Sequence, residues 1–488
     1  MRTAAATAKK RPPLHPLERA LLVVASLHLI LLPWCYSLER AWTQVGSAGL
    51  AGLAFIIALW PRTYDGVLSD GPDFKLHPWW RLVRFPLFWL GLPFLGLMVA
   101  GAFNPSWFYE TNGYRWGMLP LPNIAWLPTS ADTPFAFYNV WRTFAVYASA
   151  WLLVCALWIG VTRRRALQIL CWVLVANGLA LVTVGLIHRF SGPEYEQVVL
   201  WQRFVRNSTA FGAFTYRNHA GAYLCLIAAV AVSLAAWSHY EGRRRMAHST
   251  PGPVWLFVAF VFVAGIAYTY ARSSVLIVLL FMVLALLGWF VLRLRLGSAG
   301  ATPKLVTATL MLLLAGTGVF ALQQLDFSKL EKRFEAFQKM GEKETSYRMR
   351  VESRERVIKM WEDHWVRGTG AGSFRFLFPN YIRDNKFISG GGRYFWEHAH
   401  IDWLEIPIEQ GIAGVLLIAV AYFWWLWRWI KAGGWGHPFA LMIFLGSLQT
   451  LIHAGMDFPF QHPGVLVTWW ALLIMALRWA EFEAPKTS

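Results

Sequence analysis

The stretch SVLIVLLFMVLALLGWFVL, residues 274–292, decides the class of fold. It carries no charged residue, and Arg272 and Arg293 flank it. A helix needs about 20 apolar residues to cross the hydrocarbon core of a bilayer. Because backbone polar groups in lipid must find partners within their own segment, we predict a transmembrane helix here.

The rest of the chain repeats this pattern. Of 488 residues, 57% are hydrophobic and 15% are charged, whereas soluble domains carry roughly a quarter charged residues. We therefore predict an all-α polytopic membrane protein with about twelve transmembrane helices. The predicted spans lie near residues 17–36, 43–60, 83–103, 142–161, 166–187, 219–238, 253–270, 274–292, 304–323, 409–430, 438–455 and 463–480.

The basic residues predict the orientation. The formal net charge is +18, which in a soluble protein would suggest nucleic acid. Here the charges lie between apolar spans, so we expect phosphate on or near lipid as the partner and no nucleic acid. Cytoplasmic loops are enriched in Lys and Arg, and the six basic clusters named below all fall on one side of the twelve spans. Both termini are then cytoplasmic. The clusters are Lys9 to Arg11, Arg62 to Arg84, Arg163 to Arg165, Arg243 to Arg245, Arg293 to Lys304, and Arg428 with Lys431.

The opposite side receives the longest connection. Residues 324–405 form a predicted loop between the ninth and tenth helices, which divides the chain into 1–323, 324–405 and 406–488. Apolar residues at helical spacing predict that this loop begins as a helix, and helicity continues through Arg350 to Trp361. Three glycines then end it.

Two histidines next to acidic residues are the first candidates for chemistry. The sequence Glu397-His398-Ala399-His400-Ile401-Asp402 leads into the tenth span. Histidine titrates near neutrality and can act as a general base or acid. A metal site is an alternative, although a third clear ligand is missing from the local sequence. The histidines could also simply lie at the membrane interface.

Two arginines beside apolar spans are the second candidates. Arg272 lies in a short turn between two spans, and Arg217 precedes Asn218 at the mouth of the sixth. A charge held this close to hydrocarbon is costly and usually has a functional partner. Guanidinium groups bind phosphate in a bidentate manner. The alternative is that the side chains snorkel to lipid headgroups.

Two further segments combine glycine or acidic residues with turn patterns. The segment Gly368 to Phe374 resembles a phosphate-binding loop but lacks the Lys-Ser or Lys-Thr pair of a P-loop, so we predict a flexible turn. Asp457 lies in Asp-Phe-Pro-Phe between the last two spans, near His453. It could orient an arginine or a histidine across the bundle, or simply form the turn.

Five motifs in order resemble the O-antigen ligase and O-antigen polymerase family of bacterial membrane glycosyltransferases. Two of them depart from the family pattern at one position each, Ile401 after the histidine and Trp365 in place of proline. The motifs are His400-Ile401 followed after nine residues by Gly411-Ile-Ala-Gly414, WVRGTGAGSF at 365–374, FTYRNHAGAY at 214–223, the Ala271-Arg272-Ser273 turn, and HAGMDFP at 453–459.

This resemblance implies a fold like the C-type glycosyltransferases, with a large helical periplasmic loop between helices 9 and 10. It implies a multi-pass protein of the bacterial inner membrane with a periplasmic active face. The expected partners are a glycan on undecaprenyl pyrophosphate, an acceptor glycan or lipid A core, and membrane lipids. The implied enzyme is a metal-independent inverting glycosyltransferase without a cofactor.

The site residues follow from the same resemblance. We expect His400 to remove a proton from an acceptor hydroxyl, and Arg272 and Arg217 to hold the donor pyrophosphate. His398, Arg350 and Asp457 complete the predicted site as substrate-binding residues.

Three other functions stay open at this point. A polymerase of the same family would use the same donor and a different acceptor. A polytopic transporter or flippase would suit twelve spans, although transporters usually show repeated halves, and the two halves here are dissimilar. A non-enzymatic assembly scaffold is the third alternative.

Overall fold

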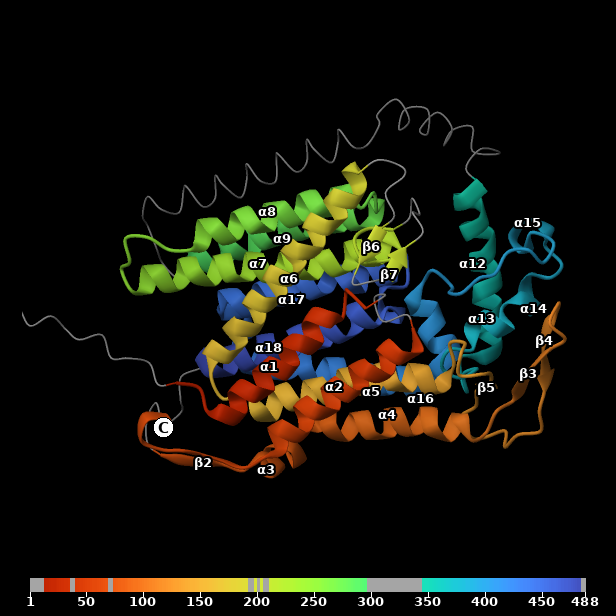
Figure 1. Cartoon of the computed structure of the whole chain (residues 1–488), viewed down its shortest axis with the longest axis horizontal. Coiled ribbons are helices and arrows are strands. Elements are labelled where there is room, and N and C mark those ends of the chain that lie inside the picture. The colour runs from red at the N-terminus through yellow and green to blue at the C-terminus, as the bar shows by residue number, and fades with distance from the viewer. Residues whose placement is uncertain are drawn as a thin grey trace, which may run out of the picture.

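The computed structural model describes residues 13–35, 40–68, 73–191, 197–199, 202–204, 210–295 and 345–483. Within these ranges a long helix stands at eleven of the twelve predicted spans (Figure 1). The predicted span 304–323 and the first part of the predicted loop lie outside them. The long helices are α1 (Pro16–Leu31), α2 (Ala41–Leu59), α4 (Pro86–Ala102), α5 (Val140–Gly160), α6 (Arg164–Phe190), α7 (Arg217–Arg244), α8 (Gly252–Tyr268), α9 (Arg272–Arg295), α16 (Asp402–Lys431), α17 (Pro438–Ala454) and α18 (Pro463–Glu483).

Length and composition make the chain a multi-pass membrane protein. Seven described helices are long and apolar enough to cross a bilayer, and α4, α8 and α17 are shorter apolar helices. The all-α, polytopic class is therefore confirmed, whereas the count of twelve stays a prediction.

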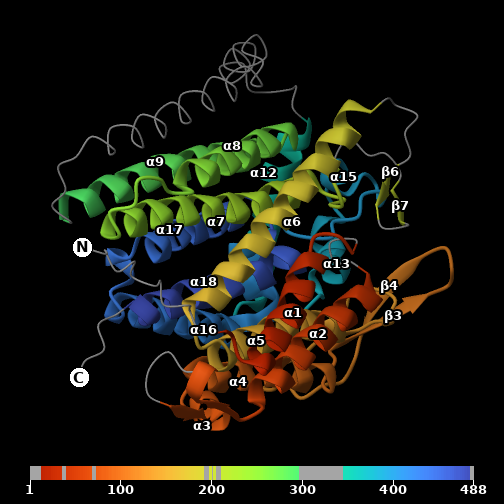
Figure 2. The ribbon, with the colours of Figure 1, turned by 60° about the vertical axis from the view of Figure 1, so that its left-hand side comes forward.

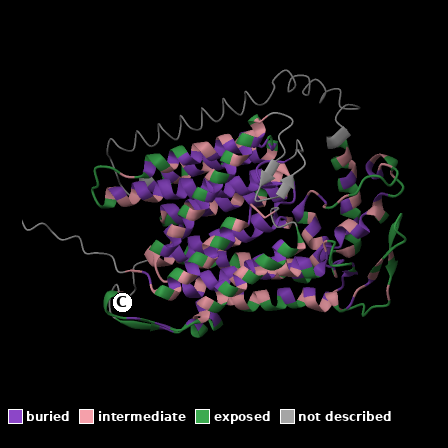
Figure 3. Cartoon of the chain, viewed as in Figure 1, coloured by how far each residue is buried: buried purple, intermediate pink, exposed green. Residues whose placement is uncertain are grey.

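Helix α7 forms the centre of the bundle. In its most apolar stretch 94% of the residues are buried, and it packs against α8 and α17 (Figure 3). Small residues, among them Ala220, Gly221 and Ala222, line α7 and are fully covered. Small side chains let helix backbones approach closely in a membrane, where association depends on van der Waals contact.

Shorter elements gather beyond one end of the bundle, which we call the loop end (Figures 1 and 2). They include strands that the all-α prediction did not contain. The antiparallel pair β3–β4 and the parallel pair β3–β5 form one small sheet. The elements are β3 (Trp107–Thr111), β4 (Trp116–Pro120), β5 (Ala131–Asp132), α12 (Thr345–His364), α13 (Phe374–Leu377), α14 (Pro379–Ile382) and α15 (Lys386–Ser389).

The remaining short elements are hairpins and single turns. Strands β1 and β2 pair antiparallel beside the short helix α3, and β6 pairs antiparallel with β7. Their bounds are β1 (Arg62–Tyr64), β2 (Phe74–Leu76), α3 (Pro78–Val83), β6 (Gln197–Val199) and β7 (Gln202–Phe204), with 3-10 turns η2 (Gly66–Leu68), η3 (Gly434–Gly436) and η4 (Pro459–Gln461).

The loop end has its own apolar core, which is anchored on α16. Met360 of α12, Phe374 of α13 and Ile408 of α16 are fully buried in one cluster. Helix α12 confirms the predicted helix through Arg350 to Trp361 and ends before Gly368.

Helix α16 begins at Asp402, seven residues before the predicted span, and contains a kink. Gly411 has φ 62° and ψ −177°, which interrupts the helix. The amides of Thr369 and Gly370 donate to the carbonyls of Ile408 (2.8 Å) and Glu409 (2.9 Å). The segment predicted to be a flexible turn is thus fixed and buried against the kink, because the kink leaves carbonyls that its amides satisfy.

Candidate active site

Asp457 lies between α17 and α18 at the loop end and collects hydrogen bonds from three elements. Its side chain is 2% exposed. It accepts from the Tyr216 hydroxyl at 3.3 Å and from the Asn218 amide, both near the start of α7, and lies 3.3 Å from Nδ1 of His400. The backbone N–H of Phe458 donates at 3.1 Å.

These donors keep Asp457 ionised. Burial opposes its charge, but the hydrogen bond from His400 and the nearby imidazoles hold the pKa of Asp457 well below its usual range. A carboxylate can only accept hydrogen bonds, so the shared proton belongs to Nδ1 of His400.

The hydrogen bond to Asp457 therefore selects, for the neutral imidazole of His400, the tautomer whose lone pair lies on Nε2. Its side chain is 26% exposed, which leaves the ring accessible. Its backbone has φ 56°, a left-handed conformation that is rare outside glycine and is often found at functional sites. The geometry therefore presents a base at the loop end.

His398 is held differently. Arg375 Nη2 lies 3.3 Å from Nε2 of His398, and arginine can only donate, so Nε2 accepts. Nδ1 then donates to Glu405 at 2.6 Å, while the other carboxylate oxygen of Glu405 accepts from the Ala399 amide at 2.6 Å. Burial and the charge of Arg375 hold the pKa of His398 well below its usual value.

Both ring nitrogens of His398 are therefore engaged by protein groups. A metal site that uses both histidines does not fit this arrangement. The hydrogen bonds of His398 instead hold in place the loop backbone that carries His400.

The ring of Phe458 contacts the rings of both histidines. The His398 ring stacks on it at 4.5 Å and 22°, and the His400 ring meets it edge-on at 4.8 Å. Tyr216 stacks on it as well, at 5.6 Å. Residue type and spacing do not mark Phe458, Tyr216 or Arg375 as site residues. Tyr216 and Phe458 lie inside two of the family-like motifs, and Arg375 follows a third.

The predicted arginines lie at the same end of the bundle. Arg217 and Arg272 are the first residues of α7 and α9. Arg217 is followed by Asn218, which bonds Asp457. Arg272 is followed by Ser273, whose hydroxyl lies 3.1 Å from Nε2 of His453, one helical turn before Asp457. Each arginine is therefore next in sequence to a residue of the Asp457 network.

Arg350 reaches the same network from the large loop. It donates to the Tyr216 hydroxyl at 3.4 Å from its position on α12. The structure thus brings His400, His398, Asp457 and Arg350 into one connected set of contacts.

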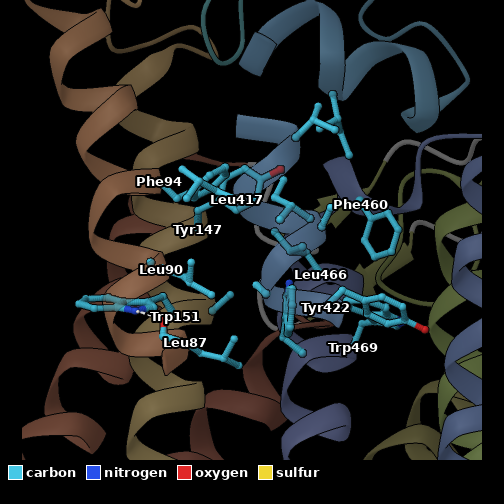
Figure 4. A pocket seen from close by; sticks show the side chains of 18 of the residues that line it. Leu87, Leu90, Phe94, Tyr147, Trp151, Leu417, Tyr422, Phe460, Leu466 and Trp469 are labelled. Carbon is cyan, nitrogen blue, oxygen red and sulfur yellow. Dashed lines mark hydrogen bonds between the residues drawn. The ribbon is translucent and has the colours of Figure 1, made fainter. Parts of the chain in front are cut away.

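An apolar cavity of about 350 Å³ lies beside this network (Figure 4). It is bounded by α4 and α5 on one side and by α16 and α18 on the other, with Phe94, Tyr147, Trp151 and Trp469 among its lining residues. Asp402, which donates its backbone N–H to the carbonyl of Asp457 at 3.2 Å, also lines the cavity. The cavity therefore extends from the residues around Asp457 into the helical bundle.

Comparison with known proteins identifies a domain in the middle of the chain. No curated protein matched the chain. Residues 255–419 match the family model described as O-antigen ligase. The match runs from α8 through α9 and the large loop to the kinked part of α16, and includes Arg272, His398 and His400. The chain is therefore a multi-pass membrane protein that carries an O-antigen ligase family domain over residues 255–419.

Proposed function

We propose that the protein transfers a glycan from undecaprenyl pyrophosphate to an acceptor hydroxyl, as an O-antigen ligase does, at the periplasmic face of the inner membrane. The observation that carries the proposal is the Asp457–His400 pair. Its hydrogen bonds direct the imidazole lone pair to Nε2, on a side chain that is 26% exposed.

The reaction needs one proton transfer and one displacement. Nε2 of His400 removes the proton of the acceptor hydroxyl as its oxygen forms a bond to the anomeric carbon. The bond from that carbon to the pyrophosphate oxygen breaks, and the configuration inverts because the attack is direct. Asp457 stabilises the imidazolium that forms, as a carboxylate beside a catalytic histidine does. No metal ion takes part in this scheme.

Arg217 and Arg272 hold the leaving group in this scheme. Negative charge grows on the pyrophosphate as the bond breaks, and fixed guanidinium groups stabilise it. Both residues stand at helix N-termini, where the helix dipole also favours an anion.

The cavity supports a lipid-linked substrate. Its lining is almost entirely apolar side chains, and it reaches Asp402 next to the Asp457 network. A hydrocarbon chain would fill such a space while its polar end stays near His400. The charge pattern of the loops supports cytoplasmic termini and hence a periplasmic site.

Substitution of His400 tests the proposal. The full-length protein, reconstituted with an undecaprenyl-pyrophosphate glycan and a lipid A core, should transfer glycan, and His400→Ala should lower the rate by about a thousandfold or more. His248→Ala is the control, since His248 is an exposed histidine after α7, at the opposite end of that helix from Arg217. Near-normal transfer by His400→Ala would refute the role of His400.

A further inference from the structure

Three partly exposed aromatic side chains surround a buried one at the loop end. Trp116 of β4, Phe137 before α5 and Phe395 before His398 are 39%, 44% and 49% exposed. Trp116 meets Phe376 of α13 and Phe395 edge-on, each at 6.0 Å. Tyr109 of β3 joins Phe376 (5.9 Å) to Phe137 (5.4 Å). We call Tyr109, Trp116, Phe137, Phe376 and Phe395 the aromatic platform.

The platform is built by four separate segments and stands beyond the helix ends. Strands β3 and β4 extend past the end of α4 in both views (Figures 1 and 2), and Figure 1 shows them beside α14. Aromatic residues that anchor a protein in the bilayer interface lie at the level of the headgroups, next to the ends of the spans. A cluster of exposed rings farther out indicates a binding surface.

Polar groups connect the platform to the candidate active site. Arg375 precedes Phe376, and its guanidinium lies 4.8 Å above the ring of Tyr138. The same guanidinium contacts His398 at 3.3 Å and Glu397 at 3.7 Å. The Glu397 side chain is 64% exposed and is available to a ligand.

We propose that the aromatic platform binds the saccharide of the acceptor. A sugar ring has a face of C–H groups with partial positive charge, and aromatic rings present a negative face, so the two stack. Hydroxyl groups at the edge of the sugar would bond to Glu397 and Arg375. The proposal rests on the proposed glycan transfer and names where its acceptor lies.

The placement of charges distinguishes the acceptor from the donor. Tyr216, Asn218 and Ser273 approach the Asp457 network from α7 and α9, the helices that Arg217 and Arg272 begin. The platform connects to it through different residues, Arg375 and His398 of the large loop. Since the proposed function gives the pyrophosphate to the two arginines, the platform is left for the second substrate.

The opposite face of the same hairpin provides a matched control. Phe108 pairs with Leu119 and is 44% exposed, whereas its neighbour Tyr109 pairs with Met118 and faces α13. Successive side chains of a strand point to opposite faces. Phe108→Ala therefore removes an equally exposed ring from the same element without touching the platform.

The test is steady-state transfer by the full-length protein with the lipid A core varied at fixed undecaprenyl-pyrophosphate glycan, and the reverse. Trp116→Leu keeps apolar bulk but loses the ring, and should raise the KM for the lipid A core about tenfold, while the donor KM changes less than about twofold. Trp116→Phe should restore most of the affinity, and Phe108→Ala should change neither KM.

A binding measurement separates this proposal from the transfer mechanism. The probe is core oligosaccharide freed of lipid A, titrated onto the His400→Ala protein, with and without Trp116→Leu. Weaker binding with Trp116→Leu supports the platform even if His400 proves not to be the base. A rise in the donor KM alone, an equal effect of Phe108→Ala, or unchanged binding of the oligosaccharide would each overturn the proposal.

Discussion

At the scale of single residues, the site depends on the direction of two hydrogen bonds. Asp457 accepts a hydrogen bond from Nδ1–H of His400, and Glu405 accepts one from Nδ1–H of His398. The two histidines differ at Nε2. In His398 this atom accepts a hydrogen bond from Arg375, whereas in His400 its lone pair faces no such donor within the described residues. The sequence motif His-Ala-His treats them alike, and the three-dimensional contacts separate them.

Asp457→Asn should therefore impair transfer without unfolding the protein. An amide can donate as well as accept, so it no longer fixes the proton on Nδ1 of His400. We expect the kcat to fall by roughly 10²- to 10⁴-fold, as for a carboxylate that orients a catalytic histidine. Rates of glycan transfer measure this. Asp384→Asn, in an exposed ion pair with Arg356 in the same loop, should stay close to wild type. A kcat for Asp457→Asn within about threefold of wild type would contradict the role of Asp457.

Acid should destabilise the protein partly through His398. Its pKa is lowered by burial, so the folded state resists a proton that the unfolded chain takes up near pH ~6.5. The stability is complete above that pH and declines as the pH falls toward the lower, folded pKa. Burial lowers the pKa of His462 to about 3, which acts in the same direction. The melting temperature should drop between pH 7.5 and 5, and His398→Gln should lessen that drop. Parallel pH curves for the two proteins would disprove the contribution of His398.

The sequence identified His398, His400, Arg350 and Asp457 as site candidates but could not assign their partners. Asp457 is 57 residues from His400, and Tyr216 lies 134 residues from Arg350. Such pairs depend on how the helices pack, which residue types and local spacing do not specify. The roles of Arg217 and Arg272 remain predictions.

At the scale of elements, the length of the apolar stretches predicted the helices, whereas the irregular segments between them were harder to predict from the sequence. The start of α16 was missed because Glu405, Pro407 and Glu409 make its first turns resemble a loop. Asp402 and Glu405 lie in the first turn, where the helix dipole favours acidic side chains. The strands β3 to β5 were missed because residues 104–141 show proline and tryptophan with little alternation.

Gly370 tests how closely the segment Gly368 to Phe374, here called the glycine segment, packs against its neighbours. Its φ is +94°, and a Cβ there would overlap the Thr129 carbonyl oxygen and Ser130 Cα. Gly370→Ala adds this overlap, about 1–3 kcal/mol, to the backbone strain of about 1–2 kcal/mol. Gly392→Ala, with φ +88° and open space around the Cβ, carries only the strain. Thermal unfolding should show a clearly larger loss for Gly370→Ala, and equal losses would show that Gly370 is not closely packed.

At the scale of the whole molecule, the cavity joins the membrane part of the bundle to the loop end. Leu90 of α4 lines it, whereas Leu92 of the same helix is 41% exposed. Leu90→Trp should narrow the space for a lipid chain and raise the KM for a substrate with a long polyprenyl chain severalfold. A donor with a short chain should be affected less, and Leu92→Trp should behave as wild type. Equal effects on long- and short-chain donors would show that the chain lies elsewhere.

The bonds between the glycine segment and the kink of α16 limit how the enzyme can open. If the large loop swung away as a lid, the carbonyls of Ile408 and Glu409 would lose the amides of Thr369 and Gly370. Each carbonyl or amide left without a partner would cost about 1–3 kcal/mol, so the segment Gly368 to Phe374 stays fixed against α16. Under the proposed function, a lipid-linked donor would then enter laterally from the membrane, between helices, and not from above the loop end.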